Sequence, residues 1–85
     1  MYVDFLYSIV NICLVKKDIL KRFGVRVKEL RLQNEWSQEL LAEKTGFHRT
    51  YIGMVERGER NLSLKNIEIF AKTFESTVSD LLKDC

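Results

Sequence analysis

The 85-residue chain has no proline and only four glycines, which excludes collagen-like repeats and proline-rich linkers and argues against a turn-dense β-sandwich. Its two cysteines, Cys13 and Cys85, lie near opposite ends and form no Cys-x-x-Cys pair, so a disulfide-stapled miniprotein and a zinc finger are excluded. With one histidine and scattered carboxylates, we expect no enzyme activity, no metal site and no cofactor. The remaining class is a small, mostly helical protein of a reducing compartment, the cytoplasm, that binds a partner.

Positive charge is concentrated in parts of the chain, although the net charge is only +2. Seven basic residues and only two acidic ones lie between Lys16 and Arg31. A polyanion responds to such a local basic face, because charges interact over about 10 Å at physiological salt. Any single lysine is explained by a solvated helix face, so this distribution suggests a nucleic-acid partner without identifying one. A second basic group in the middle of the chain comprises Arg49, Arg57, Arg60 and Lys65.

Residues 1–15 differ in composition from the rest, because twelve are apolar and only Asp4, Ser8 and Asn11 are polar. The run is shorter than the roughly 20 apolar residues that cross a membrane, and it lacks the basic start and small-residue cleavage site of a signal peptide. We therefore expect no membrane partner. The polar spacing predicts a helix buried against the domain or a second copy, whereas the β-branched residues favour a strand as the alternative.

The rest of the chain has a helical period, and we expect an apolar extension over residues 1–17 and an all-α domain of five short helices over residues 18–85. Only three residues separate the second helix from the third, which begins near His48, and this turn contains Gly46. Such spacing is typical of a helix-turn-helix, although plain helical bundles contain it too. The residues expected to cap or end the helices are Asp18, Ser37, Gly46, Gly58, Ser63 and Thr77.

The side chains over residues 23–82 indicate a fold more specifically than the spacing of the helices does. They include FGVRVKELR, WSQELLAEKTGFHRTYIGMVERGERN, SLKNIEIFAKTF and VSDLL. These segments resemble the lambda-repressor/Cro-type helix-turn-helix family, also called the xenobiotic-response-element family. The stretch HRTYIGMVERG is similar to the recognition helix of the controller proteins that accompany restriction–modification systems. The resemblance implies a five-helix lambda-repressor-like fold that binds double-stranded DNA, here with an extra N-terminal segment.

In this family the third helix enters the major groove of DNA, and its first turn reaches the base edges. Arg49 can make a bidentate contact to guanine, and Thr50 offers both a hydroxyl and a methyl group. Gly53 is expected to leave the groove-facing side bare, so that the backbone approaches the DNA closely. The residues expected to contact bases are Arg49, Thr50, Gly53 and Met54.

Contacts to the phosphate backbone are expected on both sides of the third helix. Gln38 begins the second helix, where the helix dipole favours an anion. For Tyr51, a phosphate contact and a half-buried ring on the domain surface are equally good interpretations. The residues expected to contact the DNA backbone are Gln38, Tyr51, Arg57, Arg60, Asn61 and Lys65.

Other residues are assigned to the structure of the domain. The resemblance implies an ion pair between Arg31 and Glu56, and Glu75 has to end a helix without the conformational freedom of glycine. We expect the last helix to form a homodimer interface, although some of its leucines must also serve the core. The residues expected at that interface are Val78, Leu81 and Leu82, with or without residues 2–15.

The sequence thus predicts a transcriptional regulator that binds a pseudo-palindromic operator as a homodimer. The likeness to controller proteins implies that it regulates restriction–modification genes, with no small-molecule ligand. The alternative is an antitoxin-like or adaptor module that keeps the same fold and uses its apolar N-terminus to mask a protein partner.

Overall fold

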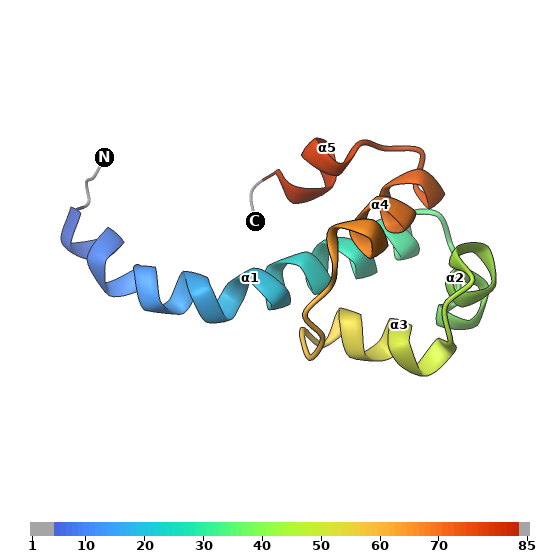
Figure 1. The fold of residues 1–85 in the computed structure, drawn as a ribbon, viewed down its shortest axis with the longest axis horizontal. Coiled ribbons are helices and arrows are strands. Elements are labelled where there is room, and N and C mark those ends of the chain that lie inside the picture. The colour runs from blue at the N-terminus through green and yellow to red at the C-terminus, as the bar shows by residue number, and fades with distance from the viewer. Residues whose placement is uncertain (1–4, 84–85) are drawn as a thin grey trace.

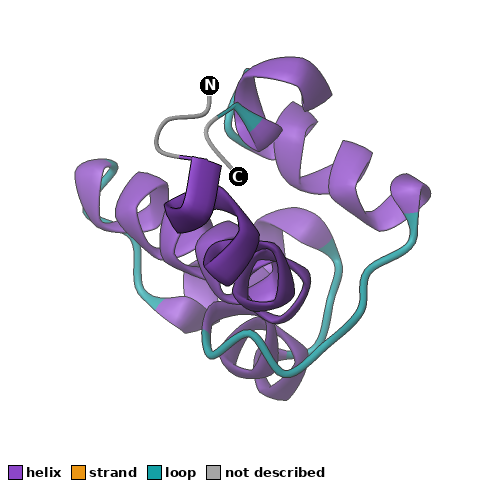
Figure 2. Ribbon diagram, turned by 90° about the vertical axis from the view of Figure 1, so that its left-hand side faces the viewer, coloured by secondary structure: helices purple, strands orange, loops and turns teal. Residues whose placement is uncertain are grey.

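The computed structural model describes the backbone of residues 5–83 and the side chains of residues 19–83. All elements in this part of the chain are helices, which confirms the predicted all-α class (Figures 1 and 2). Within the same part, no helix has both the length and the apolar character needed to cross a membrane. The helices are α1 (Phe5–Gln33), α2 (Gln38–Thr45), α3 (Arg49–Glu56), α4 (Leu64–Thr73) and α5 (Val78–Leu82).

Helix α1 is one continuous helix, and the prediction that Asp18 begins a helix is wrong. Asp18 lies well inside α1, because no glycine or proline interrupts the helix between Phe5 and Gly24. The first part of α1 projects away from the other four helices, which lie around its second part (Figures 1 and 2). The proposed division after residue 17 therefore falls within a helix. The predicted burial of the extension concerns side chains outside the described residues.

Side-chain caps begin the other helices. The hydroxyl groups of Ser37, Ser63 and Thr77 each accept the backbone N–H three residues further on, at 3.0, 3.1 and 3.0 Å. Helix α3 is capped by His48, whose Nδ1 accepts the N–H of Thr50 at 3.2 Å. Each cap satisfies a backbone donor that would otherwise lack a partner, which is worth about 1 kcal/mol. The three predicted hydroxyl caps are confirmed.

Left-handed backbone conformations end several helices. Gly46 follows α2 with φ 83°, as predicted. Glu75 follows α4 with φ 55°, which confirms that a non-glycine residue takes the helix-ending conformation there. Glu35 does the same after α1 with φ 59°, which was not predicted from the sequence. A side chain in this region costs about 1–2 kcal/mol relative to glycine.

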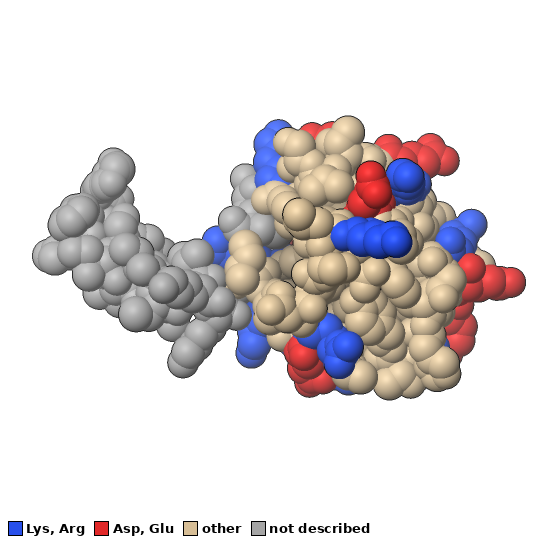
Figure 3. Space-filling model, viewed as in Figure 1, with Lys and Arg blue, Asp and Glu red and all other residues tan. Residues whose placement is uncertain are grey.

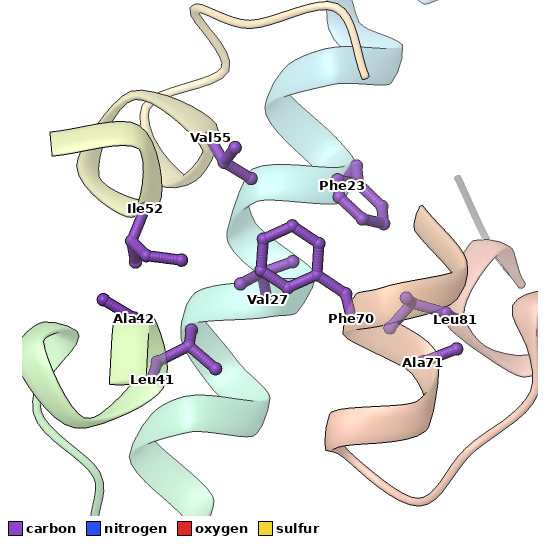
Figure 4. Packing of buried hydrophobic residues seen from close by; sticks show 9 residues of the cluster. All are labelled: Phe23, Val27, Leu41, Ala42, Ile52, Val55, Phe70, Ala71 and Leu81. Carbon is purple, nitrogen blue, oxygen red and sulfur yellow. The ribbon is translucent and has the colours of Figure 1, made fainter. Parts of the chain in front are cut away.

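The core lies where the second part of α1 meets α2 to α5 (Figure 4). The rings of Phe23 and Phe70 meet edge to face with their centroids 6.0 Å apart. At the rim, Trp36 stacks on Phe74 at 5.6 Å. The buried apolar residues are Phe23, Val27, Leu41, Ala42, Ile52, Val55, Phe70, Ala71 and Leu81.

Helix α3 lies close against α1 because α1 has a glycine at the contact. A Cβ at Gly24 would collide with the carbonyl oxygen of Val55 and lie 2.7 Å from that of Glu56. Any side chain at this position would push the two backbones apart. The close contact fixes one side of α3 to the domain and turns the opposite side outward.

Candidate nucleic-acid interface

Helices α2 and α3 and the turn between them form the candidate interface. Ile52 and Val55 of α3 are fully buried, whereas Arg49 and Thr50 at its start are exposed. The side chain of Arg49 keeps 57% of its surface accessible. The inner side of α3 therefore packs in the core, and its first turn is open to a partner.

A buried ion pair holds α3 to the rest of the domain. Arg31 Nε donates to Glu56 Oε2 at 2.6 Å, and Nη2 donates to Oε1 at 3.1 Å. Only 9% and 4% of the two side chains are exposed. Arg31 Nη1 also donates to the carbonyl oxygen of Trp36 at 2.9 Å. The pair implied by the resemblance is present, and it connects α1, the α1–α2 turn and the end of α3.

Gln38, expected to contact phosphate, takes part in the same network. Its Nε2 donates to Glu56 Oε1 at 3.0 Å, and the residue is half-buried at the start of α2. This bond uses one of the two N–H groups of the amide. A phosphate contact from Gln38 stays a prediction, now for an amide whose position is fixed by Glu56.

Arg49 has a partner that was not predicted from the sequence. Arg49 Nε lies 2.9 Å from Oε2 of Glu39, in the first turn of α2. A hydrogen bond from the backbone lowers the pKa of the Glu39 carboxyl, and the nearby charge of Arg49 lowers it further. Glu39 is therefore ionised at neutral pH. The sequence carries no clear signal for this contact, because it depends on how α2 packs against α3.

Tyr51 is half-buried in a small aromatic and polar cluster. Its hydroxyl accepts a hydrogen bond from Nδ2 of Asn66 on α4 at 3.0 Å. Its ring lies 4.8 Å from that of Phe47, and the guanidinium of Arg60 lies over it at 5.5 Å. The half-buried ring is thus present, while the phosphate contact stays a prediction. Asn66 was not foreseen, because nothing in the sequence relates it to a residue 15 positions earlier.

The bare surface expected at Gly53 is not observed, while its contact with bases stays a prediction. Gly53 is buried rather than bare, and Arg57 covers it, with Nη1 3.1 Å from the place that a Cβ would occupy. The physical reason is helical geometry, since a residue four positions later lies on the same face and its long side chain can fold back. Met54, the other residue expected one turn into α3, is half-buried.

The flanking basic residues lie on exposed surface after α3. Arg57 Nε pairs with Glu59 at 3.1 Å, and both side chains are more than half exposed. Figure 3 shows Lys and Arg side chains distributed among Asp and Glu over one face of the molecule rather than gathered into one patch. The exposed residues from the expected set are Arg57, Arg60, Asn61 and Lys65.

The three residues expected at a dimer interface lie in three different environments. Leu81 is fully buried in the core, so its assignment to an interface is wrong, because it packs inside its own domain. Leu82 is half-buried and lines an apolar hollow beside α1. Val78 lines a different, shallow hollow of about 330 Å³, together with Leu64, which is 76% exposed.

Comparison with known proteins identifies the family of this chain. A family model described as helix-turn-helix matches residues 27–81. The control protein C.SmaI of Serratia marcescens is 46% identical over 72 residues, which cover 85% of this chain and 83% of the relative. The control protein C.BamHI of Bacillus amyloliquefaciens is 48% identical over 61 residues, which cover 71% and 75%.

Solved structures point to the same family. The restriction-modification controller protein C.AhdI from Aeromonas hydrophila has a TM-score of 0.69 and 45% identity, and the match covers 75% of this chain and 96% of that one. The controller protein C.Esp1396I, solved as a tetramer with its natural 35 base-pair operator, has a TM-score of 0.69 and 34% identity over 76% and 86% of the two chains.

Proposed function

This chain belongs to the helix-turn-helix family, and we propose that it is a sequence-specific transcriptional regulator that binds a pseudo-palindromic operator as a homodimer and controls restriction–modification genes. The observation that carries the proposal is the exposed first turn of α3, with Arg49 and Thr50, on a helix whose other face is locked into the core. The operator-bound C.Esp1396I structure supports it from a relative. The role is binding rather than catalysis, and it is carried out in the cytoplasm.

Base recognition is assigned to the first turn of α3. The Nη1 and Nη2 edge of Arg49 matches the O6 and N7 acceptors of guanine, a contact worth about 1–3 kcal/mol of discrimination. Thr50 follows it with a hydroxyl for a base edge and a methyl for thymine. Met54, one turn further, contributes an apolar contact. Gly53 can approach the bases once the exposed Arg57 side chain moves from it to a phosphate.

Phosphate contacts position α3 in the groove and contribute affinity without reading sequence. The hydroxyl of Tyr51 is suited to donate to a phosphate oxygen, because the bond from Asn66 occupies it as an acceptor and leaves its own proton available. The exposed groups after α3 supply phosphate contacts on the other side of this helix. The proposed backbone contacts are Gln38, Tyr51, Arg57, Arg60, Asn61 and Lys65.

The homodimer interface is assigned to the face of α4 and α5 that carries Leu64 and Val78. Lys65 and Glu68 line the same hollow, so the patch has an apolar centre with one charge of each sign beside it. Across a two-fold axis, the apolar centre of such a patch can pack against its own copy. Two copies also supply the specificity that a single recognition helix lacks, when their α3 helices are spaced about 34 Å apart.

Selection of bound sites from a random DNA pool tests the proposal. We expect the full chain to enrich a pseudo-palindrome with guanine at symmetric positions in its half-sites. In a mobility-shift titration, the affinity for that site should fall with salt by about 0.9 log units per log unit of salt for each phosphate contact. The absence of any enriched sequence, together with flat salt dependence, would favour a protein-binding adaptor instead.

A further inference from the structure

Glu39 and Arg49 form a contact that is difficult to explain as a stability feature. The two side chains are 67% and 57% exposed, and exposed ion pairs contribute little because water screens them. The contact also places a carboxylate beside the residue that the proposed function assigns to guanine, on a face that would meet a polyanion. A negative charge there repels the phosphates and weakens DNA binding. Its presence therefore points to a role in recognition.

The atoms involved suggest what that use is. Glu39 Oε2 contacts Nε of Arg49, the inner nitrogen of the guanidinium. A guanidinium has five N–H donors in one plane, and the four on Nη1 and Nη2 form its outer edge. That outer edge makes the bidentate contact to guanine O6 and N7. The carboxylate thus engages Arg49 without occupying its outer edge.

The carboxylate itself is attached to a rigid part of the domain. Glu39 lies in the first turn of α2, which Ser37 caps. Its neighbour Gln38 is bonded to Glu56, whose side chain is only 4% exposed. Hydrogen bonding to the backbone lowers the pKa of Glu39, so the group is ionised at neutral pH. Glu39 therefore extends from a helix turn that the Ser37 cap and the buried residues Leu41 and Ala42 hold in place.

We propose that Glu39 is a positioning residue that sets the guanine preference of Arg49, by holding Nε so that the Nη1–Nη2 edge faces the bases. This inference rests on the proposed DNA-binding function. Removal of Glu39 is therefore expected to change base discrimination and overall DNA affinity in different ways. Without Glu39, the guanidinium rotates freely, so discrimination between bases falls, while affinity for DNA of any sequence stays level or rises because a negative charge is lost.

The test compares variants of the full chain on the selected operator and on a copy in which the guanine read by Arg49 is replaced by adenine in both half-sites. The position is taken from the wild-type selection, as the guanine enriched most strongly at symmetric positions in the two half-sites. Wild type should prefer guanine by about 5- to 150-fold per half-site, and Glu39→Gln should reduce this to about threefold or less. Glu43→Gln, which removes an exposed carboxylate one turn further along α2, is the matched control and should keep the full preference.

Two further variants separate geometry from charge. Glu39→Asp keeps the negative charge but shortens the side chain by one methylene, so it should lose the preference as Glu39→Gln does. In an Arg49→Lys background, where there is no guanidinium plane to orient, Glu39→Gln should leave the base preference unchanged. Circular dichroism checks that every variant is folded.

The proposal is overturned if Glu39→Gln keeps the guanine preference and only tightens binding to both DNAs by the same factor, since Glu39 would then act by charge alone. It is also overturned if Glu39→Asp behaves as wild type. If wild type binds neither DNA, the proposed function itself fails, and that result is distinct from both.

Discussion

Both carboxylate oxygens of Glu56 accept hydrogen bonds from Arg31, Oε2 from Nε at 2.6 Å and Oε1 from Nη2 at 3.1 Å. This pair joins α1 to the end of α3. Gln38 bonds to one of the same oxygens, so three helices converge on a single buried carboxylate. Such a group acts on the position of α3 as a whole. Its loss should therefore affect folding before it affects the choice of bases.

Glu56→Ala is expected to destabilise the domain by about 3–5 kcal/mol, because it leaves the buried guanidinium of Arg31 without its counter-charge. Urea unfolding followed by circular dichroism measures this loss. Under conditions in which the variant is folded, its base preference should match that of wild type. An unchanged unfolding midpoint combined with a new operator preference would contradict this structural role.

Gly24→Ala is expected to destabilise the domain although alanine is the better helix former, because the added methyl group collides with the backbone of α3. Overpacking of this kind costs about 1–3 kcal/mol, and operator affinity should fall with it as α3 is displaced. Gly46→Ala is the control, since a Cβ there meets nothing within 4 Å: it should lose about 1–2 kcal/mol through its left-handed conformation but keep the operator affinity of wild type. Thermal unfolding measures the stability of both variants, and a mobility shift measures their operator affinity. A Gly24→Ala protein more stable than wild type would refute the close helix contact.

Tyr51→Phe is expected to lower stability by about 1 kcal/mol through loss of the hydrogen bond from Asn66, and to weaken operator binding through loss of the hydroxyl proton. Asn66→Ala removes the same hydrogen bond from the other side. The stability losses of the two variants should consequently sum to more than the loss in the double variant. Strict additivity in denaturant unfolding would show that the two groups do not interact.

Leu64→Glu is expected to convert the proposed dimer to a monomer without unfolding it, because Leu64 is 76% exposed within one protomer. Sedimentation equilibrium gives the oligomeric state, and circular dichroism confirms the fold. Leu81→Ala serves as the contrast: its side chain is fully buried, so it should lose about 2–5 kcal/mol of stability. A Leu64→Glu protein that remains dimeric would move the interface elsewhere.

Local features of this fold were predictable from sequence, because they depend on neighbouring residues. The hydroxyl caps at Ser37, Ser63 and Thr77, the glycine end of α2 and the strained end at Glu75 all follow from backbone chemistry within one turn. The exception is α1, which runs through Asp18 because no helix breaker precedes this capping residue type.

Contacts between helices were less predictable. The Arg31–Glu56 pair was available only through the family resemblance, and the Glu39–Arg49 and Tyr51–Asn66 contacts depend on how α2, α3 and α4 pack. Periodicity could not assign Leu81 to the core or to an interface, because α5 is five residues long and carries apolar residues on more than one side. The cover that Arg57 gives Gly53 depends on the rotamer of one long side chain.

The central claim, that the first turn of α3 reads bases, is tested most directly by measuring how Arg49→Ala binds the selected operator and its guanine-to-adenine copy. We expect the variant to keep the unfolding midpoint of wild type, because Arg49 is exposed, and to bind the two DNAs equally well. A folded Arg49→Ala protein that still prefers the guanine-containing operator as strongly as wild type would contradict the account.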